Sequence, residues 1–81
     1  MTKVEMLISG RRALVDADMV GKMARKQMLL ANCLELRAKI EAETNPVCVR
    51  LLEESLSETV GKIARLNRTI RPSVQFIKEA V

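Results

Sequence analysis

The sequence predicts an all-α protein, an antiparallel helical hairpin with a short N-terminal helical segment. Three observations favour this fold class. Only three Gly and two Pro interrupt 81 residues, whereas Ala, Leu, Met, Glu, Lys and Arg, the residues typical of long helices, dominate the chain. Two apolar stretches of equal length flank one break at residues 44–46. The second stretch follows a strict helical period. The length allows one domain, over residues 1–81.

The first fifteen residues are expected to form a short helix. Val4, Leu7, Ile8, Leu14 and Val15 fit one helical face. Gly10 weakens this helix, because glycine has a low helix propensity.

The first long helix is predicted over residues 18–43, with Asp16 or Asp18 as its N-cap. Its apolar face is broad and less regular than that of the second helix. The residues of this face are Met19, Met23, Leu29, Leu30, Cys33, Leu34, Leu36 and Ile40.

The turn is predicted at residues 44–46 and the second long helix at residues 46–71. Pro46 suits the first helical position, and Asn45 before it is typical of an N-cap. Pro72 should kink or end the helix, which leaves residues 72–81 as a tail or final turn. The apolar residues alternate in steps of three and four, as in a coiled coil, with Thr59 at one expected position. They are Val49, Leu52, Leu56, Ile63, Leu66 and Ile70.

The chain lacks the residues that most enzymes and metal sites use. It contains no His, Trp or Tyr, and Phe76 is its one aromatic residue. Cys33 and Cys48 have no CxxC spacing, so we expect them to be small apolar residues, not zinc ligands. Continuous helices would separate them by about 10 Å along the axis, too far for an intramolecular disulfide. We therefore predict a protein that is not an enzyme and has no cofactor or metal.

No targeting or membrane segment is predicted. Residues 1–9 lack the apolar run of a signal peptide. The densest apolar stretch, residues 28–36, is interrupted by Asn32 and Glu35 and is too short to span a bilayer. We therefore expect a cytoplasmic protein without a membrane span.

The hairpin is expected to bind a partner, because two helices of this length cover only one face of each other. The partner would be another small helical protein or a second copy that completes a four-helix bundle, and the flexible methionines before the turn suit such a groove. The predicted partner-binding residues are Leu30, Leu34, Val49, Leu52, Leu56, Ile63, Leu66 and Ile70.

Charge is segregated along the chain. The net charge is +4 over residues 1–40, −4 over residues 41–60 and +4 over residues 61–81, which gives a hairpin with one acidic and one basic end. A homodimeric bundle that binds nucleic acid through its basic end is a less favoured alternative, because no aromatic residues accompany the cations. The basic patch contains Arg25, Lys26, Lys62, Arg65, Arg68 and Arg71.

The order of these features resembles that of the small co-chaperones that hold needle subunits of type III secretion systems. The early Leu7-Ile8 pair, the basic stretch at residues 24–27, the apolar residues 30–40, the Asn45-Pro46 turn and the seam at residues 52–70 carry the resemblance. It implies a helical hairpin that pairs with a second chaperone and keeps a needle subunit from polymerising. A needle-type subunit itself is a neighbouring alternative, because such subunits are also two-helix proteins of this size.

Overall fold

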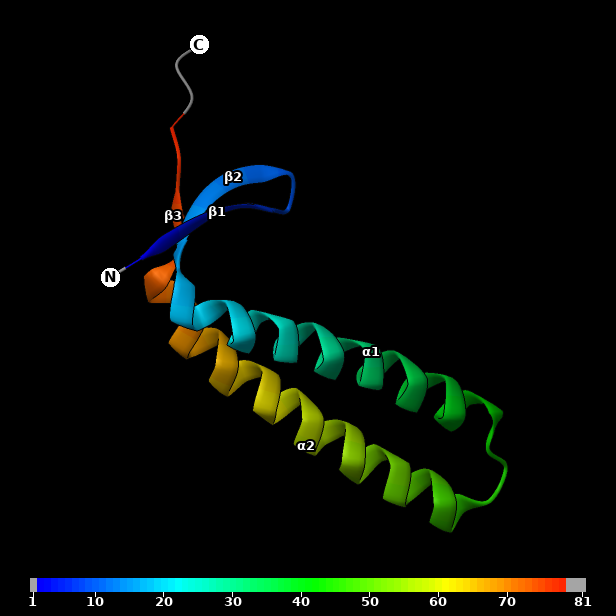
Figure 1. Cartoon of the computed structure of the whole chain (residues 1–81). Helices are drawn as coiled ribbons and strands as arrows, with labels where there is room; N and C mark the ends of the chain where they lie inside the picture. Colours follow the sequence, from blue (N-terminus) through cyan, green and yellow to red (C-terminus); the bar gives the residue numbers. More distant parts are fainter. Residues whose placement is uncertain (1, 79–81) are drawn as a thin grey trace.

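The computed structural model describes residues 2–78 and shows a long helical hairpin with a small sheet at its open end (Figure 1). Helix α1 spans Val20–Ala42 and helix α2 spans Pro46–Ile70. The predicted antiparallel helical hairpin is confirmed. The all-α class and the N-terminal helical segment are wrong, because residues 3–16 form two strands.

The N-termini of the two helices are capped differently. The Asn45 side chain accepts a hydrogen bond from the Val47 N–H at 2.9 Å, which confirms Asn45 as the N-cap of α2. A 3₁₀ turn, Ala17–Met19, leads into α1, whose N-cap is Met19 without a side-chain cap. Asp16, one of the two predicted caps, stands at the N-cap position of this 3₁₀ turn but forms no side-chain cap hydrogen bond, and Asp18 lies inside the turn. Asp16 ends a strand, and its carboxylate lies 3.9 Å from the Lys3 ammonium.

The sheet has three antiparallel strands in the order β1-β2-β3: β1 (Lys3–Ile8), β2 (Arg11–Asp16) and β3 (Gln75–Phe76). Ile8 pairs with Arg11, so Ser9 and Gly10 form a two-residue hairpin turn. Their φ angles of 51° and 77° are those of a type I′ turn, in which both central residues have positive φ. A helix over residues 1–15 cannot contain two such residues in succession.

Alternation of burial explains why residues 11–16 form a strand. Ala13 and Val15 are 0% exposed, whereas Leu14 between them is half-buried and Arg12 before them is exposed. This period of two places Ala13 and Val15 on the sheet face that packs against the helices. Met6 pairs with Ala13 and therefore lies on the same face.

The segment after α2 returns to the sheet. Helix α2 ends at Ile70, and a 3₁₀ turn, Arg71–Ser73, contains Pro72. The Ser73 hydroxyl donates to the Ile70 carbonyl at 2.8 Å, and the Ile77 N–H donates to the Arg12 carbonyl at 3.0 Å. Residues 72–81 are predicted to be a tail or final turn, and the structure has a short strand, Gln75–Phe76, after the 3₁₀ turn. The part of the predicted tail at residues 79–81 lies outside the described residues.

The molecule has a thin core and a large surface. Over residues 2–78, the buried apolar side chains are Ala13, Val15, Cys33 and Ile70. The radius of gyration is 16.7 Å, whereas a compact chain of 81 residues would have about 12 Å. No helix in the described range is long and apolar enough to cross a membrane. The shape therefore leaves much apolar surface without a partner in the chain.

Candidate partner-binding surface

The structure places six of the eight predicted partner-binding residues on the side of α2 that packs along α1. Five of them are half-buried, and Ile70 is only 5% exposed, beneath the sheet. Thr59, the polar residue of this seam, donates its hydroxyl to the Ser55 carbonyl at 2.9 Å, so its polar group is satisfied within α2. These six side chains therefore hold the hairpin together. They are Val49, Leu52, Leu56, Ile63, Leu66 and Ile70.

The other two predicted residues are directed away from the seam. Leu30 is 38% exposed and Leu34 is 67% exposed, whereas Cys33 of the same helix is buried. Leu34 is one of the most exposed large apolar side chains of α1.

Helical geometry places Leu30 and Leu34 on the side of the hairpin that carries the sheet. Met23 and Ile8 together line a cavity between α1 and β1. Leu30 and Leu34 follow Met23 by two and three helical turns and lie within about 20° of it around the axis. The apolar stripe of α1 thus continues from the cavity toward the turn.

Helix α2 contributes a matching stripe on the same side. Asn67 lines a second cavity with Ile8 and Phe76, and Val60 precedes Asn67 by two turns. Val60 is 46% exposed, and half-buried Leu56 lies one turn farther toward the hairpin turn. We call this combined surface the sheet-side face and define it by Met23, Leu30, Leu34, Leu56 and Val60.

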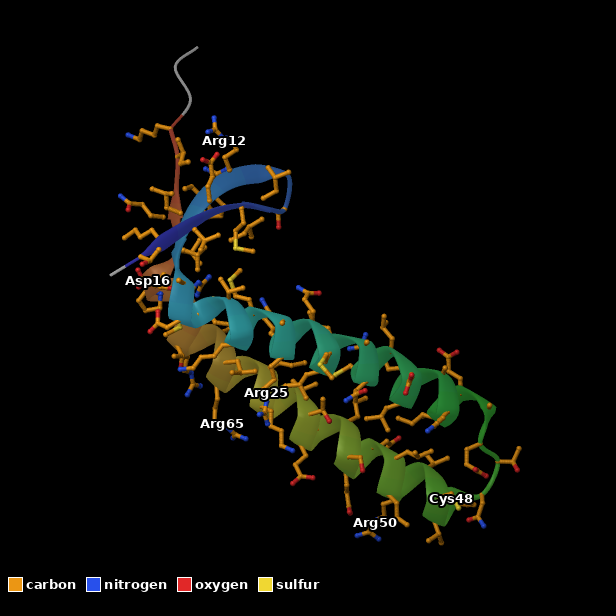
Figure 2. All side chains as sticks on the ribbon, viewed as in Figure 1. Arg12, Asp16, Arg25, Cys48, Arg50 and Arg65 are labelled. Atoms are coloured by element: carbon orange, nitrogen blue, oxygen red, sulfur yellow. The ribbon has the colours of Figure 1, made fainter. Side chains whose placement is uncertain are left out.

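The opposite side of the hairpin is basic. Figure 2 shows Arg25 on α1 and Arg65 on α2 at the same level of the hairpin, and both line one shallow groove with Lys22 and Lys62. We call these four residues the basic face. The groove floor is apolar, since Leu29 and Leu66 also line it.

The predicted basic patch is divided between the two sides. Arg25, Lys62 and Arg65 belong to the basic face. Lys26 and Arg71 instead line the cavity on the sheet side, and Lys26 is half-buried there. The structure therefore does not bring all six predicted cations to one surface.

The described residues offer few groups for chemistry. Over residues 2–78, no cluster of three or more His, Cys, Asp or Glu is close enough to hold a metal ion. Cys33 is buried and Cys48 is half-buried, and both are free thiols. The arrangement can bind through shape, apolar area and charge.

Several residues of the sheet-side cavities were not predicted from the sequence. Met6, Ile8 and Phe76 line them, but the strands that carry these residues were expected to be a helix and a tail. The Ser9-Gly10 dipeptide is the one sequence signal that pointed to a hairpin.

No protein-family model matches this chain, and neither a curated protein nor a solved structure is significantly similar to it.

Proposed function

We propose that this protein is not an enzyme and works by binding an α-helix of another protein chain on its sheet-side face. The observation that carries the proposal is Leu34, a leucine 67% exposed in the middle of a long helix, next to exposed Leu30. Apolar residues one and two turns apart form the kind of stripe that receives an amphipathic helix. A contiguous exposed patch of this kind marks an interaction surface.

The length of the sheet-side face favours an elongated partner. The face runs along both helices and ends at the cavity between β1 and α1, lined by Met6, Ile8 and Met23. Methionine side chains adapt to different apolar shapes, so this end tolerates variation in what it binds.

A needle subunit of a secretion system is one proposed partner, and a cytoplasmic co-chaperone is the corresponding role. The resemblance to needle co-chaperones, carried by residues 7–8, 24–27, 30–40, 45–46 and 52–70, supports it, together with the helical hairpin and its exposed apolar face. In that role the sheet-side face would cover an apolar helix of the needle subunit and prevent its polymerisation.

The proposal is tested by photo-crosslinking in the cells that produce the protein. A benzoylphenylalanine placed at Leu34 reports on the sheet-side face, and the same group at Leu51 is the matched control. Leu51 is 59% exposed, close to Leu34 in exposure, and lines a groove with Lys39. It precedes Val60 by nine residues, which places it about 180° from Val60 around α2 and so on the opposite side of the hairpin. We expect a discrete protein adduct at position 34 and none at position 51. Equal labelling at both positions, or no adduct at position 34, would overturn the proposal.

Nucleic-acid binding is a second candidate function, favoured by the basic face alone. Lys22, Arg25, Lys62 and Arg65 converge on one groove from two helices. Such a cluster neutralises phosphates along a backbone without reading sequence.

A further inference from the structure

We propose that the sheet-side face is closed by a second copy of this chain, stacked face to face and antiparallel about a two-fold axis. The inference rests on the proposed function, because it uses the same surface and names its occupant. Each hairpin would lay its turn over the open, sheet-bearing end of the other, giving a four-helix bundle with a sheet at each end.

Charge complementarity selects a second copy and fixes its direction. On the sheet-side face, the half of the hairpin next to the sheet carries the cations Lys26 and Arg71. The half next to the turn carries Glu41, two turns after Leu34, and Glu53, two turns before Val60, which helical geometry places on the same face. An antiparallel pair places each acidic half over a basic half, whereas a parallel pair places like charges together.

The position of the apolar residues suits a two-fold axis. The middle residue of α1 is Ala31, between Leu30 and Leu34, and the middle residue of α2 is Glu58, between Leu56 and Val60. A two-fold axis that lies between the two copies and crosses α1 and α2 at the level of these midpoints therefore brings the apolar patch of one copy onto the same patch of the other, which makes the contact isologous.

The solvent-exposed area of the chain is larger than that of a compact monomer of its mass, as expected for a subunit without its partner. The chain exposes 6386 Å², whereas a compact monomer of 9.1 kDa would expose about 4,900 Å². The excess of roughly 1,500 Å² exceeds the roughly 800 Å² that each partner buries in an interface of standard size. A second copy on the sheet-side face would remove surface of this order from water.

The sheet provides a place for the turn of the partner. In Figure 1 the β1–β2 hairpin projects over the start of α1, and the cavity beneath it is lined by Leu7, Val20 and Met23. Lys26 lines the same cavity, and Arg71 lines its neighbour. The acidic turn half of a second copy would meet these cations.

The first measurement is the mass of the purified full chain by light scattering, for the wild type and two variants. We expect twice 9.1 kDa for the wild type. Leu34→Asp should be a monomer, and Leu51→Asp should remain a dimer, because Leu51 lies about 180° from Val60 around α2. Circular dichroism of each sample shows whether the variant is folded. A folded wild-type monomer at 100 μM, or a dimeric Leu34→Asp, overturns the inference.

The second measurement is the distance between spin labels at the two turns of the dimer. A cysteine replaces exposed Thr44 in a chain that carries Cys33→Ala and Cys48→Ala. Antiparallel copies separate the turns by about the length of α1, roughly 35 Å, whereas parallel copies hold them within about 20 Å. A label at exposed Gln75 of β3 gives an independent distance at the other end. A short distance at either position overturns the antiparallel arrangement.

The results separate this inference from the proposed function. If the wild type is a monomer but benzoylphenylalanine at position 34 forms an adduct with a different protein, the inference fails and the proposed function stands. If the wild type is a monomer and position 34 forms no adduct, both fail. If the adduct at position 34 has twice the mass of the chain and the turns are far apart, both are supported.

Discussion

The Arg11 guanidinium carbon lies 4.2 Å from the centroid of the Phe76 ring, so a cation–π contact joins β2 to the last strand of the described chain. Ala13 and Phe76 are paired residues in the β2–β3 ladder, and the Ile77 N–H donates to the Arg12 carbonyl. Residues from both ends of the sequence therefore build one sheet. Because β2 leads directly into α1 and β3 follows α2, this sheet holds the open end of the hairpin together.

The contact between Arg11 and Phe76 is expected to add about 0.5–1 kcal/mol to the free energy of unfolding. A double-mutant cycle with Arg11→Ala and Phe76→Ala isolates this term, measured by urea unfolding at one fixed protein concentration. Phe76→Ala alone should cost more, because Phe76 also lines the cavity with Ile8 and Val74. Strict additivity of the two substitutions would show that the contact contributes nothing.

The turn between β1 and β2 is expected to be sensitive at both central residues. Gly10→Ala should lower the free energy of unfolding by about 1–2 kcal/mol, because φ is 77° at this position. Ser9→Asn should raise it by a few tenths of a kcal/mol, since asparagine tolerates positive φ better than serine. Thermal unfolding followed by circular dichroism measures both changes. A destabilising Ser9→Asn would contradict the type I′ assignment.

The helical hairpin was predictable from the sequence because its signals are strong and local. Pro46 with Asn45 fixes the start of α2 to the residue. The seam repeats over the 22 residues from Val49 to Ile70, long enough for its period to be unambiguous.

The sheet was missed because its signals are short and shared with a helix. Val4, Leu7 and Ile8 have the spacing of one helical face, and six-residue strands are too short for a clear period of two. Strand β3 has two residues and depends on pairing with β2, more than 60 residues away in sequence. No local pattern predicts such a pairing. The cavities at the end of the sheet-side face were therefore missed with it, since Met6, Ile8 and Phe76 lie on these strands.

Removal of the N-cap of α2 is expected to cost about 1 kcal/mol. Asn45→Ala loses the hydrogen bond from the Val47 N–H to Oδ1, which leaves that donor to water. Asn45→Asp retains an acceptor oxygen at the same place and should preserve stability within about 0.5 kcal/mol. Urea unfolding compares the two variants with the wild type. Equal losses in both would show that the cap hydrogen bond is not the stabilising feature.

Two aspartate substitutions on α2 should separate folding from binding. Ile63 is half-buried in the seam between the helices, so Ile63→Asp should cost about 3 kcal/mol or more by placing a charge there. Val60 is 46% exposed on the sheet-side face, so Val60→Asp should change the stability of the isolated chain by less than about 0.5 kcal/mol. Val60→Asp should nevertheless abolish association, as measured by light scattering. A helical, fully associated Val60→Asp variant would place the binding surface elsewhere.

The basic face provides the sharpest test of nucleic-acid binding. Arg25→Glu with Arg65→Glu reverses two of the four cations that line one groove, whereas Lys39→Glu with Arg50→Glu reverses two cations near the turn as a charge-matched control. If the groove contacts phosphates, the first pair should weaken binding to a single-stranded oligonucleotide at least tenfold more than the control. The slope of log affinity against log salt should also become shallower, because fewer counterions are released. Equal weakening by both pairs would mean that net charge alone attracts the oligonucleotide. The second candidate function would then be wrong. Binding through the sheet-side face would be unaffected, because none of the four substituted cations belongs to that face.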